Sequence, residues 1–250
     1  MTTITIGHDS EFGLKHNGVL VSALDHIKEY EGGAGRYFPD NLNCEIAINP
    51  VDNLKDFHTY TDDLLDRIRL QGFDLVLEPT IKYPDEAMTH PLAYISGCNP
   101  DFSGYTEQKN KSPDFETMDG TRSAGGHIHV GDDSLDVMNW IRWMDVFVGM
   151  PLLIKEPPNE RRKLYGGAGA MRPKPYGGEY RTLSNIWISS PKMRDFVWEG
   201  THKAVEMSKK MDTKDIEEWT DVPKSIDTHD VGLAQKTIDR LYLLGVTNVS

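Results

Sequence analysis

Cysteines are scarce in this chain: Cys44 and Cys98 are the only two among 250 residues. Cys44 falls within an apolar strand pattern, and Cys98 falls in the turn sequence Gly97-Cys-Asn-Pro100. The sequence therefore predicts neither a disulfide framework nor a zinc knuckle. It also lacks an N-terminal signal, a lipidation motif and any run of 18 apolar residues. We expect a cytoplasmic protein that makes no contact with a membrane.

Positive charge is also in short supply, since the formal net charge is −12 at pH 7. This balance makes general binding to nucleic acid unlikely, although a local basic cluster or bridging metals could still hold a polyanion. The hydrophobic content of 38% is enough for a sizeable core and excludes a disordered chain. Repeats, low-complexity tracts and a clear linker are absent, so we expect one domain over residues 1–250.

The segment Ser123-Ala-Gly-Gly-His-Ile-His-Val-Gly131 organises the rest of the prediction. Successive side chains of a strand point to opposite faces, so His127 and His129 share one face while Ile128 and Val130 share the other. Glycines at both ends allow backbone or ligand to come close. Two imidazoles on one face are suited to bind a metal, and a solvated polar strand face is the alternative interpretation.

Three other segments show the same two-faced pattern. A carboxylate in the middle of a core strand is unfavourable unless it is paired or binds a metal. If the four strands lie side by side in one sheet, their polar faces form one surface that can hold divalent cations. The residues on this predicted surface are Asp9 and Glu11 in the first strand, Glu45 in the second, His127 and His129 in the third, and Glu179 and Arg181 in the fourth.

Turn and helix signals place the remaining elements. Asn17-Gly18 predicts a two-residue hairpin turn. The glycines of residues 29–37 indicate a flexible loop, either a plain connector or a cover over a substrate. Residues 90–122 are rich in turn sequences and predict a long loop that forms a wall of the site. Helical spacing of apolar residues, with suitable capping residues, predicts helices over 52–72 (capped by Asp52), 135–149 (capped by Asp132, Asp133 or Ser134), 190–211 (capped by Ser190), 216–219 and 233–244.

A basic, glycine-rich segment runs directly into the strand that carries Glu179. Its positive residues are Arg161, Arg162, Lys163, Arg172 and Lys174. Guanidinium groups beside glycine-rich backbone suit phosphate oxygens, although the segment is not a P-loop. The alternative interpretation is a solvated basic loop.

The motifs together resemble a known family. They are Gly7-His-Asp-Ser-Glu-Phe12, Ala124-Gly-Gly-His-Ile-His-Val-Gly131, Met171-Arg-Pro-Lys-Pro-Tyr176 and Glu179-Tyr-Arg-Thr-Leu-Ser-Asn-Ile-Trp187. In this order they resemble the phage-encoded carboxylate-amine ligases of the COOH-NH2 ligase type 2 family. The resemblance implies the α+β fold of glutamine synthetase and γ-glutamylcysteine synthetase, with a curved, mainly antiparallel sheet, helices on its convex face and the site on its concave face. For a phage-encoded enzyme, the location would be the host-cell cytoplasm.

The resemblance also implies cofactors and roles for residues. It implies ATP and two or three Mg²⁺ or Mn²⁺ ions, with metal ligands at Asp9, Glu11, Glu45, His127, His129 and Glu179. The nucleotide-binding residues would be Arg162, Arg172, Lys174, Tyr176 and Arg181, of which Arg172, Lys174 and Arg181 would stabilise the phosphoryl group during transfer. The chain has Asp9 where glutamine synthetase has glutamate, and it is much shorter. The identities of the substrates therefore stay open.

The implied reaction joins a carboxylate to an amine. ATP would convert the carboxylate to an acyl phosphate, which the amine attacks to give an amide. A metal-dependent amide or phosphate hydrolase that does not use ATP is an alternative, and a kinase that stops at phosphoryl transfer is another. A non-catalytic binding protein would have no reason to keep so many buried charges. Glutamine synthetases form rings, so an oligomer is possible, but the sequence does not predict one.

Overall fold

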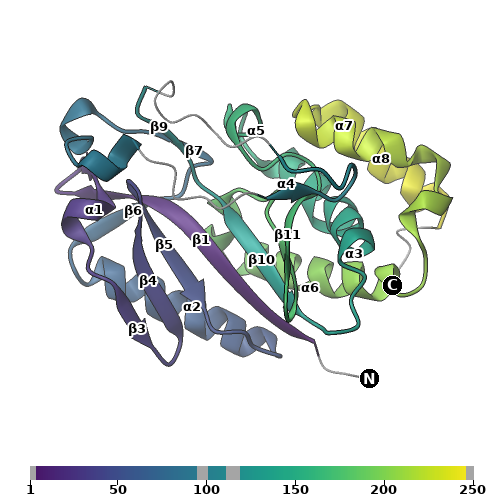
Figure 1. Cartoon of the computed structure of the whole chain (residues 1–250), viewed down its shortest axis with the longest axis horizontal. Coiled ribbons are helices and arrows are strands. Elements are labelled where there is room, and N and C mark those ends of the chain that lie inside the picture. The colour runs from purple at the N-terminus through teal and green to yellow at the C-terminus, as the bar shows by residue number, and fades with distance from the viewer. Residues whose placement is uncertain (1–3, 95–100, 111–118, 246–250) are drawn as a thin grey trace.

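One long strand, β1 (Thr5–His16), lies at the centre of the fold. A computed structural model describes residues 4–94, 101–110 and 119–245 of the chain. β1 pairs antiparallel with β5 (Asn43–Ile48) on one side and with β10 (Gly126–Gly131) on the other. Within the described residues the main sheet has the order β3-β4-β5-β1-β10-β12-β11-β8 (Figure 1). β2 and β6 pair with the C-terminal end of β1.

The remaining strands of the main sheet are short. They are β2 (Val19–Val21), β3 (Tyr30–Gly32), β4 (Gly35–Asp40), β6 (Phe73–Val76), β8 (Phe102–Ser103), β11 (Ala170–Lys174) and β12 (Gly177–Tyr180). A separate two-stranded sheet pairs β7 (Thr80–Lys82) with β9 (Thr121–Ser123). All of the strand pairs among the described residues are antiparallel. The α+β prediction with a mainly antiparallel sheet is confirmed, whereas the resemblance to the glutamine synthetase fold stays a prediction.

Helices cover the apolar face of this sheet. The even-numbered residues Ile6 and Phe12 of β1 are fully buried, as are Ile128 and Val130 of β10. The long helices α2 (Leu54–Arg69) and α6 (Pro191–Ser208) run behind the sheet in Figure 1. The remaining helices are α1 (Ala23–His26), α3 (Val137–Met144), α4 (Met150–Lys155), α5 (Arg161–Leu164), α7 (Asp221–Asp227), α8 (Val231–Leu243), the π-helix η3 (Asp145–Gly149) and the 3-10 helices η1 (Asp85–Ala87), η2 (Pro91–Tyr94), η4 (Asn185–Ser189), η5 (Thr213–Asp215) and η6 (Glu217–Thr220).

Several local predictions are confirmed. Asn17 and Gly18 have φ values of 53° and 80°, as the predicted hairpin turn between β1 and β2 requires. Ser190 caps α6 by accepting a hydrogen bond from the Met193 amide, and Pro191 occupies the first turn. The cap of α2 is Asn53 rather than Asp52, because the Asn53 side chain accepts from the Asp56 amide.

The prediction of a flexible loop over residues 29–37 is wrong. These residues form most of the antiparallel hairpin of β3 and β4, and β4 pairs with β5 along its whole length. The glycines that suggested a loop instead allow close packing, since a Cβ on Gly35 would collide with the backbone carbonyl of Ala47. The hairpin therefore adds two strands to the sheet on the side of Glu45.

The predicted helix over 135–149 is longer than expected. α3 begins after Asp136, whose side chain accepts from the Asn139 amide, and the helical segment continues through η3 and α4 to Lys155. By length and composition this segment could cross a membrane, but 72% of it is buried inside the fold. Such burial is typical of a core helix. α7 was not predicted, and Cys98 lies outside the described residues.

Candidate functional site

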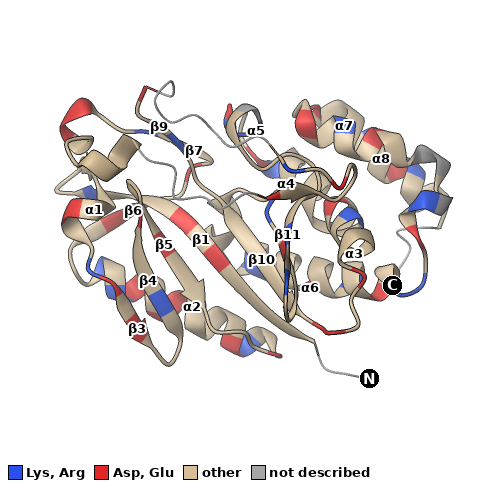
Figure 2. Ribbon diagram, in the orientation of Figure 1, with Lys and Arg blue, Asp and Glu red and all other residues tan. Residues whose placement is uncertain are grey.

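Strand register brings the predicted polar residues onto one face of the main sheet. Asp9 lies directly opposite His127 across β1 and β10, and Glu11 lies directly opposite Glu45 across β1 and β5. His129 in turn faces Glu179 on β12. The prediction that four separate segments form one surface is thus confirmed. Acidic residues occupy the middle of β1 and β5, and basic residues occupy β11, which is separated from β1 by β10 and β12 (Figure 2).

Asp9, His129 and Glu179 form the first group of possible metal ligands. Each offers one ligand atom, and these atoms lie within 4.8 Å of one another. His129 Nε2 lies 3.0 Å from Asp9 Oδ2, and His129 Nδ1 lies 2.8 Å from the Tyr176 hydroxyl. Burial alone would raise the pKa of Asp9, but the two neighbouring imidazoles hold this pKa well below its ordinary value. Asp9 is therefore ionised at neutral pH and could offer a carboxylate oxygen to a cation.

Glu11, Asp40 and Glu45 form the second group, and their ligand atoms also lie within 4.8 Å of one another. Burial and the neighbouring carboxylates raise the pKa of Glu45 well above its ordinary value. Burial, followed by the charge of Asp40, raises the pKa of Glu11 to about 7. Three carboxylates so close together repel one another until a proton or a cation neutralises them. This group is suited to receive a divalent cation.

Asp40 was missed because the sequence analysis assigned residues 29–37 to a loop and assigned no strand to residues 38–42, whereas β4 extends to Asp40. Every second residue of β4 lies on the same face of the sheet as Glu45, and these residues are Arg36, Phe38 and Asp40. The period-two pattern of residues 36–40 was the signal that could have revealed Asp40 as a third carboxylate.

His127 occupies a different environment from His129. It is only 2% exposed, and its Nδ1 lies 2.9 Å from Asp9 Oδ1. Burial, followed by the charge of Arg181, lowers the pKa of His127 to about 3, so its imidazole is neutral. Its Nε2 is buried without a hydrogen-bond partner and faces Gly125, where a Cβ would collide with it. His127 belongs to neither ligand group, and its role as a metal ligand stays a prediction.

The predicted catalytic cations gather around Glu179, which is fully buried. Lys174 Nζ lies 2.7 Å from Glu179 Oε2, Arg172 Nη1 lies 3.5 Å from Oε1, and Arg181 also pairs with Oε1. These contacts neutralise Glu179 and place three positive side chains beside the first ligand group. Arg172 and Lys174 keep about a fifth and a quarter of their side-chain surfaces exposed, so they remain accessible to an anion.

Two neighbours that the sequence did not single out hold Arg181 in place. The Arg181 guanidinium donates to the Tyr165 hydroxyl, and its Nε lies 3.5 Å from Asp101 Oδ2. Asp101 belongs to the loop that we predicted to form a wall of the site, and the described part of that loop does reach Arg181. Residues 95–100 and 111–118 of the loop lie outside the described residues.

The basic glycine-rich segment divides into two parts with different partners. Arg161 is fully buried and donates to the Thr182 carbonyl at 2.7 Å. Arg162 donates to the carbonyls of Gly166 and Thr182 and lies 3.6 Å from Glu156. Among the residues that the structure describes, and unlike Arg172 and Lys174, Arg162 therefore contacts the Gly166 and Thr182 carbonyls and Glu156 rather than the carboxylates of the two ligand groups. The side chain of Lys163 is outside the description.

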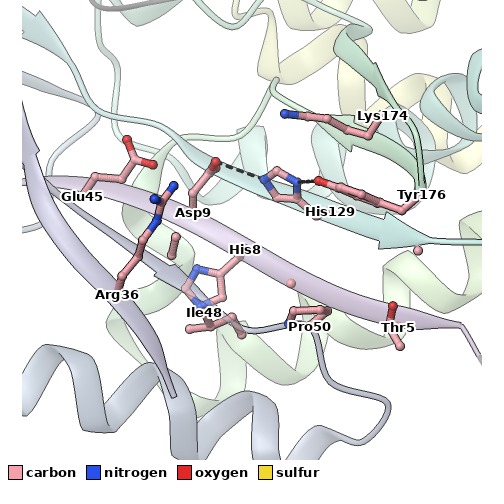
Figure 3. A pocket seen from close by; sticks show the side chains of 13 residues that line it. Thr5, His8, Asp9, Arg36, Glu45, Ile48, Pro50, His129, Lys174 and Tyr176 are labelled. Atoms are coloured by element: carbon pink, nitrogen blue, oxygen red, sulfur yellow. Dashed lines mark hydrogen bonds and ion pairs between the residues drawn. The ribbon is translucent and has the colours of Figure 1, made fainter. Parts of the chain in front are cut away.

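A cavity of about 460 Å³ opens beside the first ligand group. Polar residues line the cavity from both sides of β1: Arg36 and Glu45 lie on the side of β4 and β5, and Lys174 and Tyr176 lie on the side of β11 (Figure 3). The rest of its lining is apolar or glycine, including Gly7, Ala47, Ile48 and Pro50. A cavity with an apolar end and convergent charged groups at the other is typical of a small-molecule site.

The donor atoms on this face fit hard divalent cations. Carboxylate oxygens with one imidazole are a suitable set for Mg²⁺ or Mn²⁺. Burial and the neighbouring carboxylates raise the pKa values of Glu11 and Glu45, and a bound cation would relieve this repulsion. The residues present therefore fit the metals that the resemblance implies.

Comparison with known families supports the resemblance over part of the chain. Residues 119–222 match the family model described as phage phiEco32-like COOH.NH2 ligase-type 2. The matched segment contains both histidines of β10, Arg172 and Lys174 of β11, and Glu179 of β12. The family resemblance is thus confirmed for this half of the site, and the family's name describes enzymes that join a carboxyl group to an amine. No curated protein matches the chain.

Proposed function

We propose, from the carboxylate-amine ligase match over residues 119–222, that this protein is an ATP-dependent ligase. It would form an amide bond through an acyl-phosphate intermediate. The observation that carries this proposal is the pair of adjacent ligand groups on one sheet face, flanked by Arg172, Lys174 and Arg181. Two cation sites beside fixed positive side chains suit a polyphosphate, whose charge they neutralise during transfer.

The cavity beside the first ligand group is the proposed nucleotide site. The apolar lining from Ile48 and Pro50 suits a nucleobase, while Lys174 and Tyr176 lie near the phosphate end. Lys174 is a strong candidate for binding phosphate because its ammonium group is partly exposed beside Asp9, His129 and Glu179.

Both ligand groups would hold divalent cations in this proposal. Asp9, His129 and Glu179 would hold one, and Glu11, Asp40 and Glu45 would hold another. When bound, these cations would neutralise phosphate charge and polarise the phosphoryl oxygens. The second group, of which only Glu45 lines the cavity, would then lie on the side where the carboxylate substrate approaches.

The protein residues would contribute charge and orientation to two successive steps. A carboxylate oxygen attacks the γ-phosphorus of ATP, and the bond from that phosphorus to the β–γ bridging oxygen breaks with its electron pair leaving on ADP. The amine then attacks the acyl carbon, loses a proton and expels phosphate to leave the amide. Arg172, Lys174 and Arg181 would stabilise the phosphoryl oxygens, while Tyr165 and Asp101 hold the Arg181 guanidinium in place.

Phosphate release from ATP with Mg²⁺ tests the proposal. The protein should be assayed with panels of carboxylates and amines, singly and together, alongside Glu11→Gln and the control Glu31→Gln in the exposed strand β3. Release that needs both a carboxylate and an amine, and that Glu11→Gln abolishes, supports a ligase. Release with the carboxylate alone would indicate a kinase. Turnover of an amide or phosphate ester without ATP would instead indicate a metal-dependent hydrolase.

A further inference from the structure

Arg36 on β4 lies level with Asp9 across the sheet. Arg36 is the cross-strand partner of Ala47 on β5, and Ala47 is the partner of Asp9 on β1. Asp9 is in turn the partner of His127 on β10. The four residues therefore form one row, and the small side chain of Ala47 leaves space between Arg36 and Asp9. Arg36 lies on the flank of the carboxylates opposite Arg172 and Arg181, which belong to the β11–β12 side.

The Phe38 ring orients the Arg36 guanidinium and leaves its N–H donors available. Its Cζ lies 4.8 Å from the centre of the Phe38 ring. Within the described part of the chain it forms no ion pair with a carboxylate, and it lines the cavity of about 460 Å³. In Figure 3 the guanidinium points toward Asp9 and Glu45, while Lys174 lies above His129 on the other side of Asp9. Stacking on an aromatic ring holds a guanidinium in place while its donors stay available.

The row of Arg36 contains Asp9 of the first ligand group and lies next to the row that carries Glu11 and Glu45 of the second group. On one side of it is the row of His129 and Glu179, and on the other is the row of Glu11 and Glu45. In the proposed reaction the phosphoryl group moves from the nucleotide, beside the first group, toward a carboxylate beside the second. The charge that develops during this movement would therefore lie at the level of Arg36.

We propose that Arg36 binds the phosphoryl group during its transfer, from the wall opposite Arg172 and Arg181. This inference rests on the proposed function and adds a residue to it. As the carboxylate oxygen bonds to the γ-phosphorus and the bridging oxygen departs on ADP, the three equatorial oxygens become accessible from both flanks. The planar guanidinium of Arg36 can donate two parallel hydrogen bonds to such oxygens, which an ammonium group cannot do.

Binding of a planar phosphoryl mimic tests this role without a known substrate. Isothermal titration with Mg²⁺ should compare ADP alone with ADP plus aluminium fluoride, in the wild type and in Arg36→Ala. Because the side chain is exposed, its truncation should leave the fold intact. We expect Arg36→Ala to keep the Kd for ADP within about twofold and to weaken binding of the mimic by at least about tenfold, the loss of a charge-assisted hydrogen bond. Arg36→Lys should restore only part of the affinity.

Arg69→Ala is the matched control, because Arg69 is an exposed arginine of α2 paired with Asp66. It should bind both ADP and the mimic like the wild type. Equal affinity of Arg36→Ala and the wild type for the mimic would overturn the inference. So would an equal loss of affinity for ADP and for the mimic, since that pattern describes a ground-state nucleotide contact. If the wild type binds neither ligand, the proposed function fails, and the inference fails with it.

Discussion

Glu11 and Glu45 are direct cross-strand partners on β1 and β5, so two carboxylates face each other in the middle of the sheet. Like charges directly opposite each other destabilise a sheet, and burial adds to the cost. The group also includes Asp40, whose pKa is raised mainly by burial. This arrangement lowers the stability of the fold unless a proton or a cation neutralises the carboxylates, which agrees with the proposal that the group holds a cation.

A divalent cation should raise the melting temperature through this group. Mg²⁺ or Mn²⁺ binds the folded state and removes the repulsion between carboxylates, so thermal unfolding should shift upward with metal concentration relative to EDTA. Glu45→Gln should lose most of this shift, because it removes one oxygen ligand and one charge. Glu31→Gln, in the exposed strand β3, should keep it. An undiminished shift in Glu45→Gln would show that the cation binds elsewhere.

The two halves of the basic segment should respond differently to mutation. Lys174→Ala removes a partly exposed ammonium group beside the cavity and should weaken ADP binding in Mg²⁺ by about tenfold or more. Arg162→Ala removes donors to the Gly166 and Thr182 carbonyls, so it should lower the melting temperature and change the Kd for ADP by less than about twofold. Calorimetric titration and thermal unfolding of both variants test this division. Weaker ADP binding in a folded Arg162→Ala protein would restore the original prediction for Arg162.

Asp145 should make stability depend on pH. This fully buried carboxyl accepts from the hydroxyls of Tyr105 and Tyr180, and burial raises its pKa from 3.8 to about 7 despite these bonds. Between pH 4 and 7 the folded state therefore binds the proton more tightly than the unfolded state. The stabilisation is complete below about pH 4 and is lost as pH rises toward 7, by up to about 1.4 kcal/mol per pH unit.

Asp145→Asn removes this titration while keeping a carbonyl acceptor for one tyrosine. The difference in the free energy of unfolding, wild type minus variant, should decrease from pH 4.5 to pH 7.5 in urea titrations. A difference that stays constant across this range would show that Asp145 titrates at its ordinary pKa in the folded protein.

The β3–β4 hairpin should tolerate a side chain at Gly33 but not at Gly35. Gly35 has a φ of 134°, and a Cβ there would collide with the Ala47 carbonyl and the Ile48 backbone. Gly35→Ala should reduce the free energy of unfolding by more than about 1 kcal/mol. A Cβ on Gly33 would meet no atom within 4 Å, so Gly33→Ala should change it by less than about 0.5 kcal/mol. Equal stability of the two variants would show that the hairpin can shift away from β5.

The strand pattern predicted much of the site from the sequence. Alternation placed Asp9 with Glu11, and His127 with His129, on one face of their own strands, because period-two alternation is a local property of an extended chain. That the strands of these residues, of Glu45 and of Glu179 adjoin was a condition, which the structure meets. Asn17-Gly18 and the Ser190 cap were also predicted from local properties, because their conformations depend on neighbouring residues alone.

Only the tertiary structure decided which strands and cations complete that face. The glycines around Gly35 suggested a loop, and only the pairing of β4 with β5 brings Arg36 and Asp40 to the face that carries Glu45. Arg162 and Lys174 are equally basic in sequence, but one meets buried carbonyls and the other meets Glu179. A long cationic side chain binds the acceptor that the fold brings near it. The identity of that acceptor is a long-range property that no local pattern contains.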